Sequence, residues 1–248
     1  MFAGVLILVY AVVSYAVFLA SFLYAIGFVG NYLVSRSIDV GGPAYIAGAI
    51  VVDLLLIGLF ALQHSIMARP AFKQWWTKLC PPAYERSTYV LLSSLILLLL
   101  FWQWRPIPIV IWQVTGVPGA ALTLVCWLGW SIVLASTYMI DHFELSGLRQ
   151  AFAALRGTAP ADQPFRTPLL YKIVRHPLML GFLLAFWATP EMTVGHLLFA
   201  AATTAYILVG LWFEERDLIA RFGASYQQYR RRVPMLLPRI FGRAGAER

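Results

Sequence analysis

Long apolar segments decide what this chain can fold into. Four stretches, at roughly 4–30, 44–62, 88–111 and 118–140, carry almost no charge. A helix of about 20 such residues crosses the hydrocarbon core of a bilayer. Of the 248 residues, 60% are hydrophobic and only 12% are charged, whereas soluble domains carry about 25% charged residues. The sequence therefore predicts an all-α, polytopic integral membrane protein with about four spanning helices, and excludes an ordinary soluble domain.

The apolar region 178–213 differs from the first four because Thr189-Pro190-Glu191 interrupts it. Proline and a charge in its middle favour two helices joined by a tight turn, a helical hairpin with a short first arm. The stretch 214–234 reads as an amphipathic helix, a turn at Phe222-Gly223, and a basic, aromatic segment that suits the membrane surface. We expect one membrane domain over 1–248, with a four-helix transmembrane part at 1–140 and the hairpin and C-terminal segment at 141–248.

The cations predict how the protein is oriented. Of 19 Lys and Arg residues, 17 lie in 63–87, in 141–177 and after residue 213, which is one side of the predicted bundle. The positive-inside rule assigns that side, with both termini, to the cytoplasm. The net charge of +8 is thus explained by orientation and contact with anionic lipid, and we expect no nucleic-acid partner. The run 1–30 lacks a basic n-region and a cleavage site, so we expect it to remain as the first helix.

Isolated polar residues give weaker signals. Cys80 and Cys126 are too few and too far apart for a disulfide framework or a zinc site, and no metal is predicted. Asp53, within the second helix, is expected to pair with a polar group from another helix, because a lone charge at membrane depth is costly. His64 lies at the cytoplasmic end of that helix, where a solvated cap is as consistent with the pattern as a functional role.

Polar residues gather at the cytoplasmic ends of the later helices. The segment 137–150, TYMIDHFELSGLRQ, closes the fourth helix, 171–181, YKIVRHPLMLG, opens the hairpin, and Glu214-Glu215 closes it. The opening and closing ends of a hairpin lie side by side. We therefore expect His176 to meet Glu214-Glu215 although 38 positions separate His176 from Glu214.

The chemistry of this cluster suits a zwitterionic ligand. The first turn of a helix offers free N–H groups to a carboxylate, and Pro177 fits that turn. The two glutamates offer acceptors for an ammonium group or a ribose diol. Aromatic faces for a base or a cation come from Tyr171, Tyr226 and Tyr229. Together these groups suit S-adenosylmethionine, although the residues alone also allow other zwitterions, nucleotides, or a plain role as interfacial anchors and salt bridges.

Three ordered motifs carry a resemblance to a known family. They are Tyr-x-x-x-Arg-His-Pro-x-x-x-Gly at 171–181, Glu-Glu-x-x-Leu at 214–218 and Phe-Gly-x-x-Tyr-x-x-Tyr at 222–229. The set resembles membrane methyltransferases related to isoprenylcysteine carboxyl methyltransferase and phospholipid methyltransferases. The resemblance implies that 141–248 binds S-adenosylmethionine at the cytoplasmic face. The implied cofactor residues are Tyr171, His176, Pro177, Gly181, Glu214, Glu215, Tyr226 and Tyr229.

The same family places an arginine shortly before the glutamate pair to meet a carboxylate substrate. Here 207–213 is entirely apolar or glycine, which argues against a carboxylate acceptor. The stretch 137–150 is instead similar to one found in bacterial methanethiol S-methyltransferases. This second resemblance implies methylation of methanethiol to dimethyl sulfide by an enzyme of the bacterial inner membrane.

A thiol acceptor needs a proton acceptor, because the thiolate is the nucleophile. We hypothesise that His142, oriented by Asp141, takes this proton, and that Arg149 or Arg175 stabilises the thiolate. The residues also leave room for an isoprenoid thiol, a larger thiol or a lipid amine as acceptor. A non-catalytic membrane accessory protein of the same fold is the remaining alternative.

Overall fold

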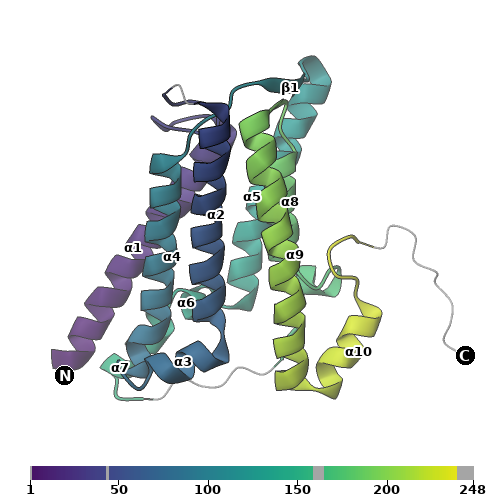
Figure 1. The fold of residues 1–248 in the computed structure, drawn as a ribbon. Coiled ribbons are helices and arrows are strands. Elements are labelled where there is room, and N and C mark those ends of the chain that lie inside the picture. Colours follow the sequence, from purple (N-terminus) through teal and green to yellow (C-terminus); the bar gives the residue numbers. More distant parts are fainter. Residues whose placement is uncertain (1, 43–44, 159–164, 239–248) are drawn as a thin grey trace, which may run out of the picture.

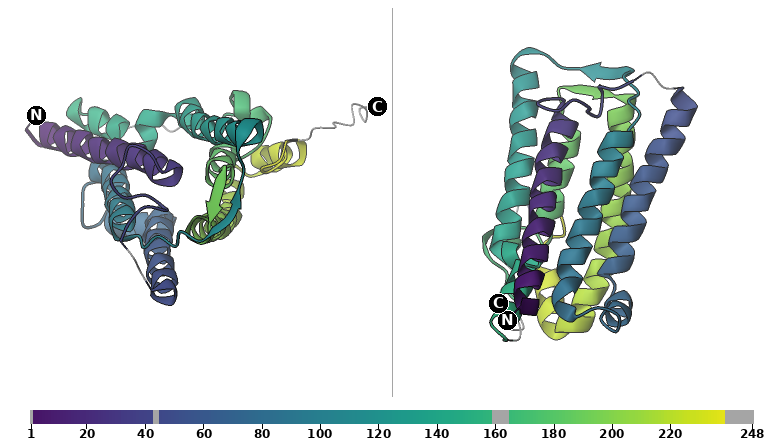
Figure 2. Two further views of the ribbon diagram at one scale, coloured as in Figure 1. Left: turned by 90° about the horizontal axis from the view of Figure 1, so that it is seen from above. Right: turned by 90° about the vertical axis from the view of Figure 1, so that its left-hand side faces the viewer.

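Five helices of the computed structural model are long and apolar enough to span a membrane. The structure describes residues 2–42, 45–158 and 165–238. The spanning helices are α1 (Phe2–Gly30), α2 (Ile46–Ala68), α4 (Pro82–Gln103), α5 (Gly116–Ile140) and α9 (Val194–Phe222). They run side by side along one common direction (Figures 1 and 2). The predicted all-α, polytopic membrane fold is thereby confirmed.

The predicted hairpin consists of the short helix α8 (Pro177–Trp187) and the long helix α9. Its tip is more than a turn, because β2 (Glu191–Thr193) pairs antiparallel with β1 (Val110–Gln113). The prediction of one helix over 88–111 was wrong at its end, since α4 stops at Gln103. Pro106 and Pro108 follow directly, and proline cannot continue a helix.

Short helices gather at the end of the bundle where α1 begins (Figure 1). They are α3 (Pro70–Trp76), α6 (His142–Leu145), α7 (Leu148–Leu155), the 3-10 turn η1 (Leu169–Lys172) and α10 (Ala224–Arg232). This is also the end that carries the loops rich in Lys and Arg. Three of the cations used to predict orientation lie outside the described residues: Arg239, Arg243 and Arg248.

An aromatic core fills the bundle toward the opposite end, where α1 and α4 finish and α9 starts. The ring centroids of Phe28 and Phe101 are 4.7 Å apart, and those of Trp104 and Phe199 are 5.7 Å apart. All four side chains are buried. Since these rings occupy the interior at one end, the polar side chains discussed below lie at the other.

Helices α5 and α8 approach each other very closely. A Cβ atom added to Gly181 would lie 2.7 Å from the carbonyl oxygen of Gly129 and 2.9 Å from the backbone nitrogen of Val133. Small residues at such a contact let two membrane helices pack backbone to backbone. This contact places the first turn of α8 beside the last turns of α5.

Candidate active site

The start of α8 is anchored by the chain that follows α10. Arg175 and His176 precede Pro177, the first residue of α8. The backbone N–H of Arg175 donates to the carbonyl of Pro234 at 2.8 Å, and that of His176 donates to the carbonyl of Met235 at 3.2 Å. Two backbone hydrogen bonds to the segment after α10 therefore fix the backbone of Arg175 and His176, just before α8.

A buried carboxylate, Glu215 on α9, joins three helical segments. Its Oε1 accepts hydrogen bonds from Arg175 Nε at 2.7 Å and from Tyr226 Oη at 3.1 Å, and it lies 3.1 Å from His176 Nε2. Its Oε2 lies 3.1 Å from Arg230 Nε. Only 9% of the Glu215 side chain is exposed. The predicted meeting of His176 with the glutamate pair is confirmed, and Glu215 ties the start of α8 to α9 and α10.

Arg175 is committed to the same cluster. Besides Glu215, its guanidinium donates through one terminal nitrogen to the carbonyls of Arg230 and Val233, each at 2.9 Å. The side chain is only 8% exposed. The structure thus places Arg175 as a bridge between α8 and the end of α10.

The neighbouring carboxylate, Glu214, has different surroundings. Its side chain is 47% exposed, and its Oε2 lies 3.5 Å from His176 Nδ1. His176 itself is buried, so it stands between a buried acid and an accessible one. Glu214 is therefore the carboxylate of the pair that a ligand can reach.

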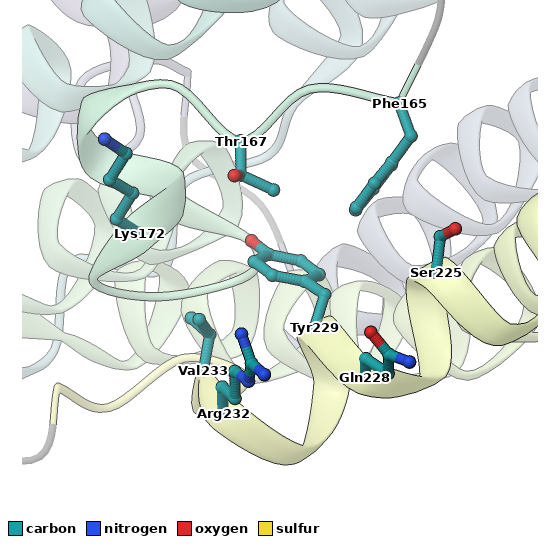
Figure 3. A pocket seen from close by; sticks show the side chains of 8 residues that line it. All are labelled: Phe165, Thr167, Lys172, Ser225, Gln228, Tyr229, Arg232 and Val233. Carbon is teal, nitrogen blue, oxygen red and sulfur yellow. The ribbon is translucent and has the colours of Figure 1, made fainter.

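A cavity of about 280 Å³ opens next to this cluster, between the segment before α8 and helix α10 (Figure 3). The ring of Phe165 lies 5.3 Å from that of Tyr229 and 5.8 Å from that of Tyr226. Tyr229 Oη donates to the carbonyl of Tyr171 at 2.6 Å. The lining residues are Phe165, Thr167, Lys172, Ser225, Gln228, Tyr229, Arg232 and Val233.

The tyrosines of this region are neutral hydrogen-bond donors. Burial raises the pKa of Tyr229 to about 12, and it also raises the pKa values of Tyr171 and Tyr226. Tyr226 is buried, and its hydroxyl donates a hydrogen bond to Glu215. Tyr229 instead lines the cavity. Of the two predicted tyrosines in α10, Tyr226 therefore supports Glu215, and Tyr229 is available to a ligand.

Two further predicted cofactor residues shape the backbone. Pro177 begins α8, where its missing N–H leaves no helical hydrogen bond unmade. Gly181 lies in the close contact with α5. Both residues define where α8 starts and how near it comes to α5.

The other predicted catalytic residues form a second group at the end of α5. Asp141 caps α6 by accepting the backbone N–H of Glu144 at 2.9 Å, and it forms an ion pair with Arg149. The His142 imidazole is buried, with Nε2 2.9 Å from Tyr15 Oη and Nδ1 3.0 Å from Thr137 Oγ1. Asp141 and Arg149 thus pair with each other, whereas the His142 imidazole is held by Tyr15 and Thr137 and not by Asp141 as expected. Arg175 belongs to the Glu215 cluster.

His142 is poised as a neutral imidazole. Burial lowers its pKa below the ordinary histidine value, and the nearby Asp141 carboxylate opposes this shift only in part. A neutral imidazole can accept a proton at neutral pH. The second group therefore has the protonation state that a general base requires.

Several residues of the site were missed from the sequence. Tyr15 is one of three tyrosines, with Tyr10 and Tyr24, in an apolar helix of 29 residues, and no pattern there distinguishes it. Arg230 begins a run of three arginines, and nothing in that run distinguishes the residue that reaches Glu215. Phe165 lies in a loop, where periodicity gives no guidance.

The fold and these two groups define a helical integral membrane protein with a polar site at one end of its bundle. The chain belongs to the NnrU protein family, which matches residues 53–229. That span includes His142, Arg175, His176, Glu214, Glu215 and Tyr229, but not Tyr15 or Arg230.

Several individual proteins are similar to this chain over most of its length. Methanethiol S-methyltransferase 2 of Bradyrhizobium diazoefficiens is 72% identical over 243 residues, which cover 98% of this chain and 94% of the relative. Methanethiol S-methyltransferase of Mycobacterium tuberculosis is 58% identical over 234 residues, which cover 94% of this chain and 96% of the relative. Nurim of Bos taurus is 30% identical over 178 residues, covering 68% of each. No solved structure matches the chain. The resemblance to bacterial methanethiol S-methyltransferases is confirmed.

Proposed function

We propose that this protein transfers a methyl group from S-adenosylmethionine to methanethiol and so forms dimethyl sulfide. Relatives at 72% and 58% identity over nearly the whole chain carry the name methanethiol S-methyltransferase. The five apolar helices make it an integral membrane protein. The clustering of Lys and Arg at the end that holds α3, α7 and α10 supports a bacterial inner-membrane location with that end, and both termini, in the cytoplasm.

The observation that carries the proposal is the accessible Glu214 carboxylate beside His176 at the start of α8. A ligand with an ammonium group or a ribose diol finds an acceptor in Glu214. A ligand carboxylate finds the first-turn N–H groups of α8, which have no acceptor within their own helix. An adenine ring finds the aromatic faces of Phe165 and Tyr229. These residue types fit S-adenosylmethionine, which when bound supplies an electrophilic methyl group on a sulfonium.

The chain's own residues supply positioning and proton transfer. Glu215, held by Arg175, Tyr226 and Arg230, fixes His176 and the start of α8, so that Glu214 is presented in one orientation. Positioning of this kind contributes several kcal/mol to a displacement reaction, up to about 7–11 kcal/mol in model systems. His142 is the proposed base for the thiol proton, and the nearby Asp141 carboxylate, paired with Arg149, favours the resulting imidazolium.

Two measurements on purified protein in detergent test the proposal. Calorimetric titration with S-adenosylmethionine measures cofactor binding, and headspace gas chromatography measures dimethyl sulfide formed from methanethiol. Replacing Glu214 by glutamine should weaken cofactor binding about tenfold or more, since it removes a charge-assisted interaction worth about 1.5–3 kcal/mol. Glu191→Gln is the matched control, because Glu191 lies at the opposite end of the bundle, bonded to Gln113.

Each failure has a distinct meaning. A wild-type protein that binds no S-adenosylmethionine contradicts the proposal and favours a non-catalytic accessory protein. A protein that binds the cofactor and methylates a lipid amine or a larger thiol, but not methanethiol, keeps the methyltransferase and overturns the acceptor.

A further inference from the structure

A tyrosine–histidine pair that the sequence pattern does not reveal lies at the end of α5. The hydroxyl of Thr137 donates to the carbonyl of Leu134 at 2.8 Å. Its lone pairs therefore remain to accept the N–H of His142 Nδ1, 3.0 Å away. This places the proton of the neutral imidazole on Nδ1 and the lone pair on Nε2. The Tyr15 hydroxyl, 2.9 Å from Nε2, then donates to the imidazole.

This pair lies at the same depth in the bundle as His176. Helices α5 and α8 run in opposite directions (Figure 1), and Gly181 is level with the backbone between Gly129 and Val133. Counting five residues back along α8 at about 1.5 Å per residue brings His176 level with Ser136. Thr137, which holds the imidazole, follows Ser136 directly. The pair and the proposed cofactor site therefore face the same layer of the membrane.

A buried hydroxyl at this depth has no hydrogen-bond partner among the described residues. Ser136 is fully buried, and within the described part of the chain its hydroxyl has no hydrogen-bond partner. A buried hydroxyl without a partner is unfavourable. Ser136 directly precedes Thr137 in α5, and a ligand with a polar hydrogen in this layer would complete its hydrogen bonding.

The surroundings of His142 suit a small sulfur compound. Tyr138 stacks on the imidazole at 4.4 Å with an interplanar angle of 9°. Tyr15, Phe18 and Phe143 approach the imidazole with ring centroids between 5.6 and 6.3 Å away. Aromatic rings make favourable contacts with thioether-like sulfur and attract cations such as a sulfonium. Aromatic rings around an imidazole that bonds to a tyrosine hydroxyl suit a small acceptor made of a methyl group and an S–H group.

We propose that Tyr15 is the group that takes the proton of the thiol acceptor, and that it hands its own hydroxyl proton to His142. The inference rests on the proposed methyl transfer and adds a catalytic residue to it. The thiol S–H bond breaks and its proton moves to Tyr15 Oη, while the Tyr15 proton moves to His142 Nε2. The sulfur lone pair forms the new S–CH₃ bond as the bond between that methyl group and the sulfonium breaks.

Charge balances in this step. The sulfonium loses its positive charge, the thioether product is neutral, and one proton remains on His142. The resulting imidazolium is stabilised by its Nδ1–H bond to Thr137 and by the Asp141 carboxylate. Around His142, the titratable and charged groups of the described residues are Tyr15, Tyr138 and Asp141, with Arg149 and Glu144 behind Asp141.

A second pair of the same design gives a rival. Tyr89 Oη lies 2.7 Å from His64 Nε2, and His64 Nδ1 lies 3.3 Å from Ser93 Oγ, which donates to Gln63. This pair sits between α2 and α4, and His64 also packs against Tyr206 of α9, the helix that carries Glu214. Tyr89→Phe therefore removes the equivalent hydroxyl of the other candidate pair. Tyr10→Phe removes a hydroxyl from α1 itself, one that bonds to Thr88 at 3.0 Å.

The experiment measures the pH dependence of kcat/KM for methanethiol in wild type, Tyr15→Phe, Tyr10→Phe and Tyr89→Phe. The kcat/KM of the wild-type protein should become independent of pH above the lowered pKa of His142, because the imidazole is then neutral and can accept a proton. The kcat/KM of Tyr15→Phe at pH 7 should be about 10²-fold lower than that of wild type. Its rate should then rise about tenfold per pH unit, since only thiolate already present in solution reacts.

Two readouts need no turnover. Calorimetry should give all three variants the cofactor affinity of wild type within about twofold, which shows that the fold persists. The imidazole of His142, followed by NMR, should titrate at higher pH in Tyr15→Phe than in wild type, because the donor to its neutral form is gone. Tyr10→Phe should leave that titration unchanged.

Three results overturn the inference. The first is Tyr15→Phe with more than half of the wild-type kcat/KM at pH 7. The second is a loss of activity in that variant with a pH profile as flat as that of wild type, which indicates a structural role. The third is the loss and the steep profile appearing in Tyr89→Phe instead. A wild-type protein that makes no dimethyl sulfide refutes the proposed function itself and is thereby distinguished from all three.

Discussion

Replacing Glu215 by glutamine should release α10 from the bundle. The substitution keeps the size of the side chain but removes the charge that Arg175, 8% exposed, faces at 2.7 Å. Breaking a buried ion pair from one side costs about 3–5 kcal/mol, because the other charge stays buried without compensation. Arg230, 52% exposed, can return to water and adds little. We therefore expect a loss of about 3 kcal/mol, located in the docking of α10 against α8 and α9.

Limited proteolysis by trypsin measures this docking, because Arg230, Arg231 and Arg232 lie in α10. At about 1.4 kcal/mol for each tenfold change, a loss of 3 kcal/mol raises the cleavage rate in α10 about 10²-fold. Glu214→Gln is the matched control: it removes the same charge one residue away, from a side chain that is 47% exposed. An exposed pair contributes about 0–1 kcal/mol, so its cleavage rate should stay within about fivefold of wild type. Equal cleavage of the two variants would show that Glu215 does not hold α10 against the bundle.

Two further predictions concern helix packing and pH. Gly181→Ala should lower stability by about 1–3 kcal/mol, because its Cβ meets the backbone of Gly129 at 2.7 Å and the helices must separate; the unfolding temperature in detergent measures this, and Gly210→Ala, with nothing within 4 Å, should show no such loss. The lowered pKa of His142 contributes stability that is complete above the ordinary histidine value of about 6.5 and declines as pH falls toward the folded-state pKa. His142→Gln should therefore reduce the drop in unfolding temperature between about pH 7 and pH 5, and an unchanged drop would show that His142 is not the group that titrates.

Hydropathy was sufficient for the spanning helices but not for their ends. A continuous apolar run says that a segment suits lipid, and it does not distinguish a helix from a strand. The residues Val110–Gln113 are as apolar as the helix before them, and their strand partner lies about 80 positions later. The end of α4 could be read locally, because Pro106 and Pro108 cannot continue a helix. The apolar residues around them, Ile107 and 109–111, hid that signal.

Topology predicted the cofactor cluster better than any single motif did. A hairpin must bring its two ends together, so the contact of His176 with Glu215 followed from the order of helices alone. The different exposure of Glu214 and Glu215 follows from a rotation of about 100° between adjacent helix positions, and this depends on how α9 is turned against α8. The role of Gly181 in helix packing depends on Gly129, which the sequence does not pair with it. Tyr15 reaches His142 across 127 positions, and no local pattern records such a contact.

Methyl transfer by the purified wild-type protein tests the proposed function most directly. The protein is supplied with S-adenosylmethionine and methanethiol, and dimethyl sulfide is measured in the headspace together with S-adenosylhomocysteine in solution. The two products should appear in equal amounts, and Glu214→Gln should form both more slowly at a cofactor concentration near the wild-type Kd. Absence of dimethyl sulfide from a protein that binds S-adenosylmethionine would contradict the proposed function.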